Sequence, residues 1–337
     1  MISAAPSVCA CAPGKVLIAG EYAILEGAPA VVMAVDRRAR ARIGVDRGGR
    51  ARSPFLEAAR DAIAARFGHG SAPAARVEEI SVDTSELSHA GSKLGLGSSA
   101  AVTAAAVALA IGDSSNHDCL DRPLVHEIAH HAHAAAQAPK GARGSGADVA
   151  AAVYGGVLRV QRCAAASGSP GKPLAVERLP WPAALEQALV WTGKVAKTPE
   201  LIARVSTGRH ADPAGYARAI AGIESAASRL VAAMGANDVP AVLDAVDQGA
   251  DALAELAVCS RVPLMPPIYT KAREIARACG GVAKPAGAGG GDLVLVLLDG
   301  AAARREFGRE AEDAGLTLIA AGLDSLGVCL ADDFNNG

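Results

Sequence analysis

Aromatic side chains are scarce in this chain: Phe, Trp and Tyr together make up 3% of its residues, although 51% of the residues are hydrophobic. A packed core must therefore be built from alanine, valine, leucine and isoleucine. The chain has 337 residues, which is enough for two domains or one large one. We therefore expect a globular protein with an aliphatic core.

Several other features are absent. The formal net charge is only −2, so nothing attracts the whole chain to nucleic acid or to an anionic membrane. The seven cysteines include a C-x-C pair, Cys9 and Cys11, but no zinc-type CxxC, which favours reduced thiols. Residues 1–14 contain no Lys or Arg, so the basic segment that begins a signal peptide is missing. The apolar run at 99–111 is too short to span a bilayer. We expect a soluble cytoplasmic protein with no nucleic acid or membrane partner.

Lysine is also rare, because only 8 of the 33 basic residues are Lys. Lysine is a compact point charge on a flexible stem, which suits single phosphate oxygens. Most of these lysines fall in or beside loops that contain glycine: Lys15, Lys93, Lys140, Lys194, Lys197 and Lys284. This placement indicates local sites for an anionic ligand.

The pattern of apolar residues and turns predicts an α+β protein, with strands first and helices later. We expect strands at 7–20 (two, broken by Pro13-Gly14), 29–46 (one or two), 77–82, 157–162, 188–193, 293–298, 316–320 and 326–331. We expect helices at 54–67, 98–111, 121–137, 198–207, 212–234, 238–257, 264–279 and 301–314.

The most informative segment is Lys93-Leu-Gly-Leu-Gly-Ser-Ser99, which leads directly into the alanine-rich helix. The N-terminus of a helix offers unpaired N–H groups and a positive dipole end, and both favour phosphate. Three more loops are rich in glycine or lysine: Ala12-Pro-Gly-Lys15 and its continuation to Leu25, Gly144-Ser-Gly-Ala-Asp148, and Lys284-Pro-Ala-Gly-Ala-Gly-Gly-Gly-Asp292. Together they predict a site for phosphorylated ligands.

This set of loops, in this order, resembles the GHMP kinase superfamily, which includes galactokinase, homoserine kinase and mevalonate kinase. The resemblance covers nearly the whole chain, from Ala12 to Asp292, and is greatest to the phosphomevalonate kinases. Features of that subfamily are Tyr22 after Gly20-Glu21, Lys93 before the glycine turn, Gly144-Ser-Gly-Ala-Asp148 and Trp191-Thr-Gly-Lys-Val-Ala-Lys197. Ala286 and Ala147 depart from the usual pattern, and both could alter the shape of the acceptor pocket.

The resemblance implies a two-domain GHMP kinase fold: an N-terminal mixed α/β nucleotide-binding domain (1–180) and a C-terminal ferredoxin-like α+β domain (181–337). It implies ATP and Mg²⁺ as cofactors, 5-phosphomevalonate as substrate, 5-diphosphomevalonate as product, and a monomer or homodimer. Asp148 and Lys15 would be catalytic, and Ser99 would contact the metal. The nucleotide would be bound by Lys93, Gly95, Leu96, Gly97, Ser98 and Ser99. The substrate would be bound by Lys15, Glu21, Tyr22, Arg143, Ser145, Lys197, Ala288 and Gly289.

The acceptor decides what Asp148 must do. An alcohol acceptor has a proton that a general base must remove. A phosphate monoester is already mostly a dianion at neutral pH, because its second pKa is about 6. With such an acceptor, Asp148 would orient Lys15 or a metal, and lysines would hold two phosphates together.

Other interpretations remain open. Mevalonate kinase is the main alternative, followed by other small-molecule GHMP kinases and a non-catalytic GHMP-like binding protein. Gly95-x-Gly97-x-x-Ala100 also fits a dinucleotide-binding pattern, but that pattern needs a buried strand before it, and residues 83–93 are polar. His126 and His130 have i, i+4 spacing that could bind a metal. We expect instead that they, His131 and His133 form a partly exposed helix face.

Overall fold

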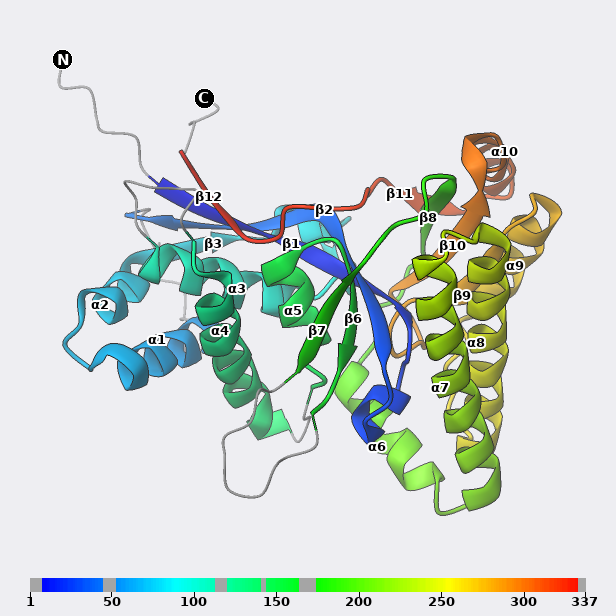
Figure 1. Cartoon of the computed structure of the whole chain (residues 1–337), viewed down its shortest axis with the longest axis horizontal. Coiled ribbons are helices and arrows are strands. Elements are labelled where there is room, and N and C mark those ends of the chain that lie inside the picture. Colours follow the sequence, from blue (N-terminus) through cyan, green and yellow to red (C-terminus); the bar gives the residue numbers. More distant parts are fainter. Residues whose placement is uncertain (1–7, 45–52, 113–119, 141–143, 164–173, 333–337) are drawn as a thin grey trace.

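The computed structural model describes residues 8–44, 53–112, 120–140, 144–163 and 174–332. They form two α+β halves, each built around an antiparallel sheet (Figure 1). This confirms the predicted mixed two-domain architecture. In this part of the chain, no helix is both long and apolar enough to cross a membrane.

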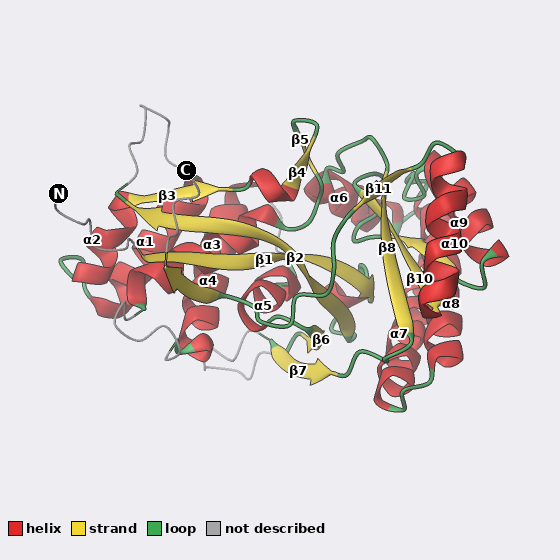
Figure 2. Cartoon of the chain, turned by 90° about the horizontal axis from the view of Figure 1, so that it is seen from above, coloured by secondary structure: helices red, strands yellow, loops and turns green. Residues whose placement is uncertain are grey.

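The first sheet has the strand order β12-β1-β2-β6-β7, and β3 pairs with the C-terminal end of β2. Its two long central strands extend toward the second half of the molecule (Figure 2). The helices α3 and α5 lie against this sheet, and α1, α2 and α4 pack on α3, which is apolar on all sides and buried along nearly its whole length. The strands are β1 (Val8–Ala19), β2 (Ala30–Ile43), β3 (Ile80–Asp83), β6 (Val157–Gln161), β7 (Ala175–Leu179) and β12 (Cys329–Asp332). The helices are α1 (Pro54–Phe67), α2 (Ala72–Glu79), α3 (Ser98–Ile111), α4 (Arg122–Gln137) and α5 (Ala147–Tyr154).

The second sheet has the order β11-β8-β10-β9. Its central strand β10 reads Leu-Val-Leu-Val-Leu-Leu-Asp and is buried on both faces, which explains its continuous apolar run. The strands of this sheet are β8 (Leu185–Trp191), β9 (Val282–Pro285), β10 (Leu293–Asp299) and β11 (Thr317–Ile319). The helices of this half are α6 (Thr198–Gly208), α7 (Pro213–Gly235), α8 (Val239–Ser260), α9 (Pro267–Ala278) and α10 (Gly300–Asp313). A small hairpin, β4 (Ser88–His89) and β5 (Ser92–Lys93), leads into the glycine turn before α3.

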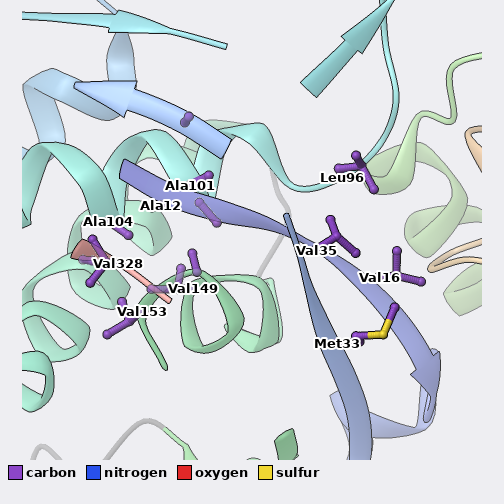
Figure 3. Close-up of a cluster of buried hydrophobic side chains, with 14 of the residues drawn as sticks. Ala12, Val16, Met33, Val35, Leu96, Ala101, Ala104, Val149, Val153 and Val328 are labelled. Carbon is purple, nitrogen blue, oxygen red and sulfur yellow. The ribbon is translucent and has the colours of Figure 1, made fainter. Parts of the chain in front are cut away.

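The core of the first half is aliphatic, as the shortage of aromatic residues predicts. Leu96 of the glycine turn, Ala101 of α3 and Val149 of α5 belong to one buried cluster with Ala12 of β1 (Figure 3). The starts of α3 and α5 are therefore fixed by packing against the same strand.

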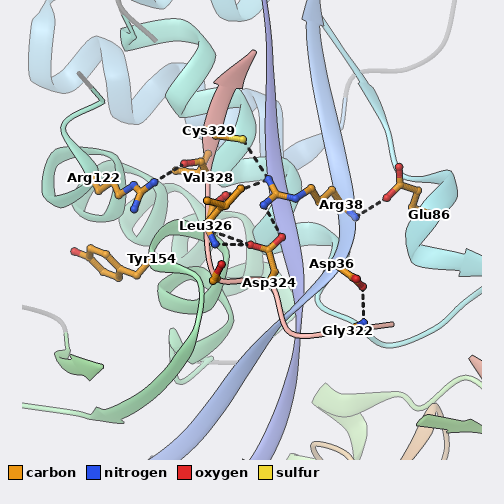
Figure 4. A network of polar contacts seen from close by, with 12 residues as sticks. Asp36, Arg38, Glu86, Arg122, Tyr154, Gly322, Asp324, Leu326, Val328 and Cys329 are labelled. Atoms are coloured by element: carbon orange, nitrogen blue, oxygen red, sulfur yellow. Dashed lines mark hydrogen bonds and ion pairs between the residues drawn. The ribbon is translucent and has the colours of Figure 1, made fainter. Parts of the chain in front are cut away.

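The last strand of the chain returns to the first sheet, where β12 pairs with β1. An ion pair between Arg38 Nη2 and Asp324 Oδ2, at 2.5 Å, holds the segment before β12 against β2 (Figure 4). The second carboxylate oxygen of Asp324 accepts N–H bonds from Leu326 and Gly327, each at 3.0 Å. This network fixes the segment that leads into β12 against the sheet of the N-terminal half.

Two secondary-structure predictions were wrong. Residues 8–19 form one strand rather than two, because a β-bulge between Pro13 and Gly14 accommodates the proline. The segment 77–82 is the end of α2 followed by β3. Ser71 caps that helix by accepting from Ala74 N, and Pro73 lies in the first turn.

Candidate active site

A cavity of about 470 Å³ lies where loops of the two halves meet. Its walls are formed by the end of β1, the glycine turn, the starts of α3 and α5, and two loops of the second half. The residues that line it include Lys15, Glu21, Tyr22, Lys93, Gly95, Gly97, Ser98, Ser99, Gln137, Ser145, Asp148, Lys197, Ala288 and Asp292. The apolar part of the lining includes Leu17, Ile24, Phe55, Val195 and Ile202.

The glycine turn brings the N-terminus of α3 to this cavity. Gly97 precedes the helix with φ of 75°, and no side chain caps the helix start. The first N–H groups of a helix have no partner within the helix, so those of Ser98 and Ser99 are available to an anion. The geometry fits the phosphate site expected from the sequence.

Gly95 permits a contact between the two halves. Its φ is 73°, and a Cβ at this position would lie only 2.2 Å from Cγ of Asp292. Burial raises the pKa of Asp292, while a hydrogen bond from Ala196 N to its Oδ1, at 2.8 Å, acts in the opposite direction. Asp292 therefore joins the glycine turn to the loop that carries Ala196 and Lys197.

Lys15 is held on the glycine turn by two hydrogen bonds. Its backbone N–H donates to Leu96 O at 2.8 Å, and its Nζ donates to Gly95 O at 3.4 Å. Asp148 is the second residue of α5, and its Oδ1 accepts a hydrogen bond from Val149 N at 3.0 Å. Both side chains approach Gly97, since a Cβ there would lie 3.1 Å from Lys15 Cγ and 3.6 Å from Asp148 Cβ. The ammonium and the carboxylate thus flank the start of α3.

Glu21 and Tyr22 join the end of β1 to the opposite half. Tyr22 has a strained backbone, with φ of 60°, and its hydroxyl donates to Ala288 O at 2.7 Å. Burial raises the pKa of Tyr22 well above its usual value, so the hydroxyl is protonated. Glu21 pairs with Nζ of Lys284, and both side chains are almost completely buried. Lys284, which does not line the cavity itself, therefore neutralises a carboxylate of the cavity wall.

Three lysines line the cavity among the side chains that the structure describes: Lys15, Lys93 and Lys197. Lys93 is exposed at the end of β5, and Lys197 forms only an exposed ion pair with Glu200, at 3.1 Å. Exposed pairs of this kind are weak, so a bound anion can compete for the Lys197 ammonium. The lining is suited to ligands with several negative charges.

The structure brings together most of the residues predicted for the site. Leu96 and Gly289 do not line the cavity: Leu96 is buried beneath the glycine turn, and a Cβ on Gly289 would lie 2.3 Å from Leu264 O. Arg143 lies outside the described residues. Before the glycine turn stands the two-residue strand β5 rather than the long buried strand that dinucleotide binding needs.

The prediction for the histidine helix was wrong in one respect. His126 and His133 of α4 are buried rather than partly exposed. His126 packs against the rings of His130 and Tyr154, and burial lowers its pKa to about 4. His133 lies behind the cavity, with Nε2 at 3.0 Å from Ser99 Oγ. No role at the site was predicted for His133, although the helix face that carries it shows a regular i, i+4, i+7, i+11 spacing of His126, His130, His133 and Gln137.

Comparison with known proteins gives results that agree with this geometry. The family models for the N-terminal and C-terminal domains of GHMP kinases match residues 56–156 and 230–314. A phosphomevalonate kinase from Streptomyces sp. (strain CL190) is 28% identical over 346 residues, which cover 87% of this chain and 90% of that protein.

Solved structures share the fold. Phosphomevalonate kinase from Streptococcus pneumoniae, in complex with phosphomevalonate and AMPPNP, superposes with a TM-score of 0.73 at 19% identity, over 94% of this chain and 99% of that one. Mevalonate kinase from L. major, in complex with R-mevalonate, gives a TM-score of 0.68 at 17% identity, over 94% and 96%. The two family models, which together match more than half of the chain, show that it belongs to the GHMP kinases, and membership of this family implies a phosphotransferase.

Proposed function

We propose that this enzyme is a phosphomevalonate kinase, which transfers the terminal phosphoryl group of ATP to (R)-5-phosphomevalonate and forms 5-diphosphomevalonate. One observation carries the proposal: Lys15, Lys93 and Lys197 surround a single cavity into which the start of α3 opens. The similarity to a protein named phosphomevalonate kinase supports the same substrate.

The arrangement of charges favours an acceptor that carries a phosphate. The reaction would bring together two anionic reactants, whose repulsion must be offset by cations. A lysine about 4 Å from one phosphate charge gains roughly 4 kcal/mol before desolvation, at an effective dielectric of 20. Mevalonate lacks the phosphate that would use these contacts, so the cavity should discriminate against it.

The residues can be assigned roles on this basis. The N–H groups of Ser98 and Ser99 would hold ATP phosphates, and the Lys93 ammonium would hold these phosphates together with the phosphate of the acceptor. Lys15 would lie beside the group in transfer. Glu21, Tyr22, Ser145, Lys197 and Ala288 would form the acceptor side. Arg143 and Gly289 remain candidates for the acceptor side by resemblance alone.

Magnesium fits the oxygen groups at the start of the two helices. No cluster of three His, Cys, Asp or Glu side chains within the described ranges could form a closed metal site. Mg²⁺ commonly uses only one or two protein oxygens and completes its shell with phosphates and water. Ser99 Oγ and the Asp148 carboxylate are placed to supply such oxygens, and the bound ion would neutralise charge on the phosphates.

Asp148→Asn should lower kcat by less than about 100-fold, the smallest loss expected for removal of an essential general base. The acceptor dianion has no proton to surrender, and the Asn carbonyl can still accept from Val149 N. The measurement is coupled ADP release with 5-phosphomevalonate, alongside circular dichroism. Complete loss of turnover in a folded variant would show that the carboxylate is indispensable and contradict this role.

Lys93→Met should raise the KM for 5-phosphomevalonate about 10-fold or more, because a charge-assisted contact worth about 1.4 kcal/mol corresponds to a factor of ten. Thermal stability should change little, since Lys93 is exposed. Lys271→Met provides a control, because Lys271 lies on α9 and does not line the cavity. An unchanged KM in the Lys93 variant would remove this residue from the acceptor site.

A panel of acceptors tests the proposed function. ADP release should be measured with mevalonate, 5-phosphomevalonate, homoserine and galactose as separate acceptors. We expect kcat/KM for 5-phosphomevalonate to exceed that for mevalonate by at least about 100-fold, because a site built to bind a polar group can reject an analogue that lacks it by about 10⁴–10⁵-fold. A preference for mevalonate, or for either of the other two alcohols, would overturn the proposal.

A further inference from the structure

His133 occupies a position between the starts of two helices that open into the cavity. Its Nε2 lies 3.0 Å from Ser99 Oγ at the start of α3 and 3.8 Å from Asp148 Oδ2 at the start of α5. The side chain is only 4% exposed, so water cannot replace these partners. One ring nitrogen thus faces both of the oxygen groups proposed to contact metal and phosphate.

The imidazole is fixed by its surroundings. The ring of Phe55 stacks on it, with centroids 5.3 Å apart and an interplanar angle of 25°. The amide of Gln137, one helical turn further along α4, reaches the ring with Nε2 to Nε2 at 3.0 Å. Because the amide nitrogen and oxygen are assigned from the hydrogen-bond network, either can face the ring. These two contacts hold the plane of the ring in place, and Nε2 is the ring nitrogen that faces Ser99.

The neighbours of Nε2 also indicate where the proton lies. A ring nitrogen carries either one proton or one lone pair, so Ser99 and Gln137 cannot both donate to it. A proton on Nε2 can be donated to Ser99 Oγ, is attracted by the Asp148 carboxylate, and is compatible with the Gln137 carbonyl oxygen. Ser99 then accepts from His133 through one lone pair, and its other lone pair and its hydroxyl proton remain available to a ligand.

We propose that His133 is a positioning residue for phosphoryl transfer. Its Nε2–H orients the Ser99 hydroxyl toward the cavity and keeps the start of α3 at a fixed position relative to Asp148. This inference rests on the proposed kinase function. His133 touches no reactant in this arrangement, because it lies behind Ser99 and does not line the cavity. It acts through Ser99, as groups behind metal ligands do in other enzymes.

Two substitutions separate positioning from packing. His133→Phe keeps the ring volume and the stacking on Phe55 but removes the nitrogen, whereas His133→Gln keeps a polar group near the position of Nε2. If His133 positions Ser99, the Phe variant should lose roughly 10- to 100-fold in kcat. The Gln variant should recover a clear part of that loss, and the KM for 5-phosphomevalonate should stay within about 2-fold in both. His131→Gln, on the exposed side of the same helix, is the matched control and should behave as the native enzyme.

A role of His133 in packing alone would give different results. If the Phe variant is as active as the native enzyme, or if the Gln variant is the less active of the two, His133 serves packing and the proposal is wrong. If the native enzyme transfers phosphate to no acceptor, the kinase proposal fails instead.

A readout that needs no turnover keeps the two ideas separate. NMR of the imidazole nitrogens of the native protein should show a protonated, pyrrole-type Nε2 for His133, and Ser99→Ala should shift that signal while leaving the His131 signal in place. An unprotonated Nε2, or a signal that does not respond to Ser99→Ala, would overturn the inference even in an active kinase. Urea denaturation of each variant establishes that the comparison is made between folded proteins.

Discussion

Lys15→Met should lower kcat by about 100- to 1,000-fold, the loss typical of removing one preorganised electrostatic group from an active site. The physical reason is its position. The backbone of Lys15 is bonded to Leu96 O and its ammonium to Gly95 O, so the charge lies beside the glycine turn before any ligand arrives. Under the proposed function, this charge would lie beside the transferring phosphoryl group, where negative charge develops.

The measurement is kcat by coupled ADP release, together with nucleotide affinity by titration calorimetry. Lys15→Arg is the informative companion, because arginine keeps the charge but presents it in a planar fork of different reach. We expect Lys15→Arg to recover only a small part of kcat, and both variants to retain nucleotide affinity within about 10-fold. A Lys15→Met enzyme with kcat within about 10-fold of native would exclude Lys15 from the catalytic step.

Lys284→Met should lower the free energy of unfolding by about 3–5 kcal/mol, the usual cost of removing one partner of a buried ion pair. Lys284 is 1% exposed and Glu21 is 3% exposed, so the change would leave a carboxylate uncompensated in the interior. The ammonium also donates to Pro285 O at 2.8 Å, a bond that methionine cannot make. Urea denaturation followed by circular dichroism measures the loss.

Two further variants make this prediction specific. The double change Glu21→Leu with Lys284→Met should recover much of the stability, because an apolar pair can replace a buried ion pair at little cost. Arg229→Met breaks an ion pair with Asp244 in which both side chains are about half exposed, and should cost less than about 1 kcal/mol. If Lys284→Met costs no more than Arg229→Met, the pair does not hold the two halves together.

The sequence predicted the position of most elements because hydrophobic periodicity and capping residues are local signals. The helix expected at 121–137 is an example: Asp121 and Pro123 are residues that favour a helix start, and Asp121 is the N-cap of α4. The bulge in β1 was not predictable, because it depends on pairing with β2. The strand β9 was missed for a similar reason, since four residues carry little periodic signal and pairing with β10 defines them.

The site was predictable where glycine and lysine cluster, and less so where a role depends on tertiary contacts. Lys15, Ser99 and Asp148 stood in loops whose composition indicated phosphate binding. Lys284 stood in such a loop too, but it is buried with Glu21, a residue 263 positions away, and no local pattern reveals that pair. His133 gave a usable signal in its spacing on α4, yet only the packed structure shows that this face turns toward Ser99.

The most direct test of the central claim is phosphorus NMR of the product formed from ATP, Mg²⁺ and 5-phosphomevalonate. We predict two coupled phosphorus resonances of a new diphosphate ester, which appear as the signal of the monoester disappears. ATP consumption that yields only orthophosphate, with the monoester signal unchanged, would contradict the account, because phosphate would then be transferred to water instead of to the anionic acceptor.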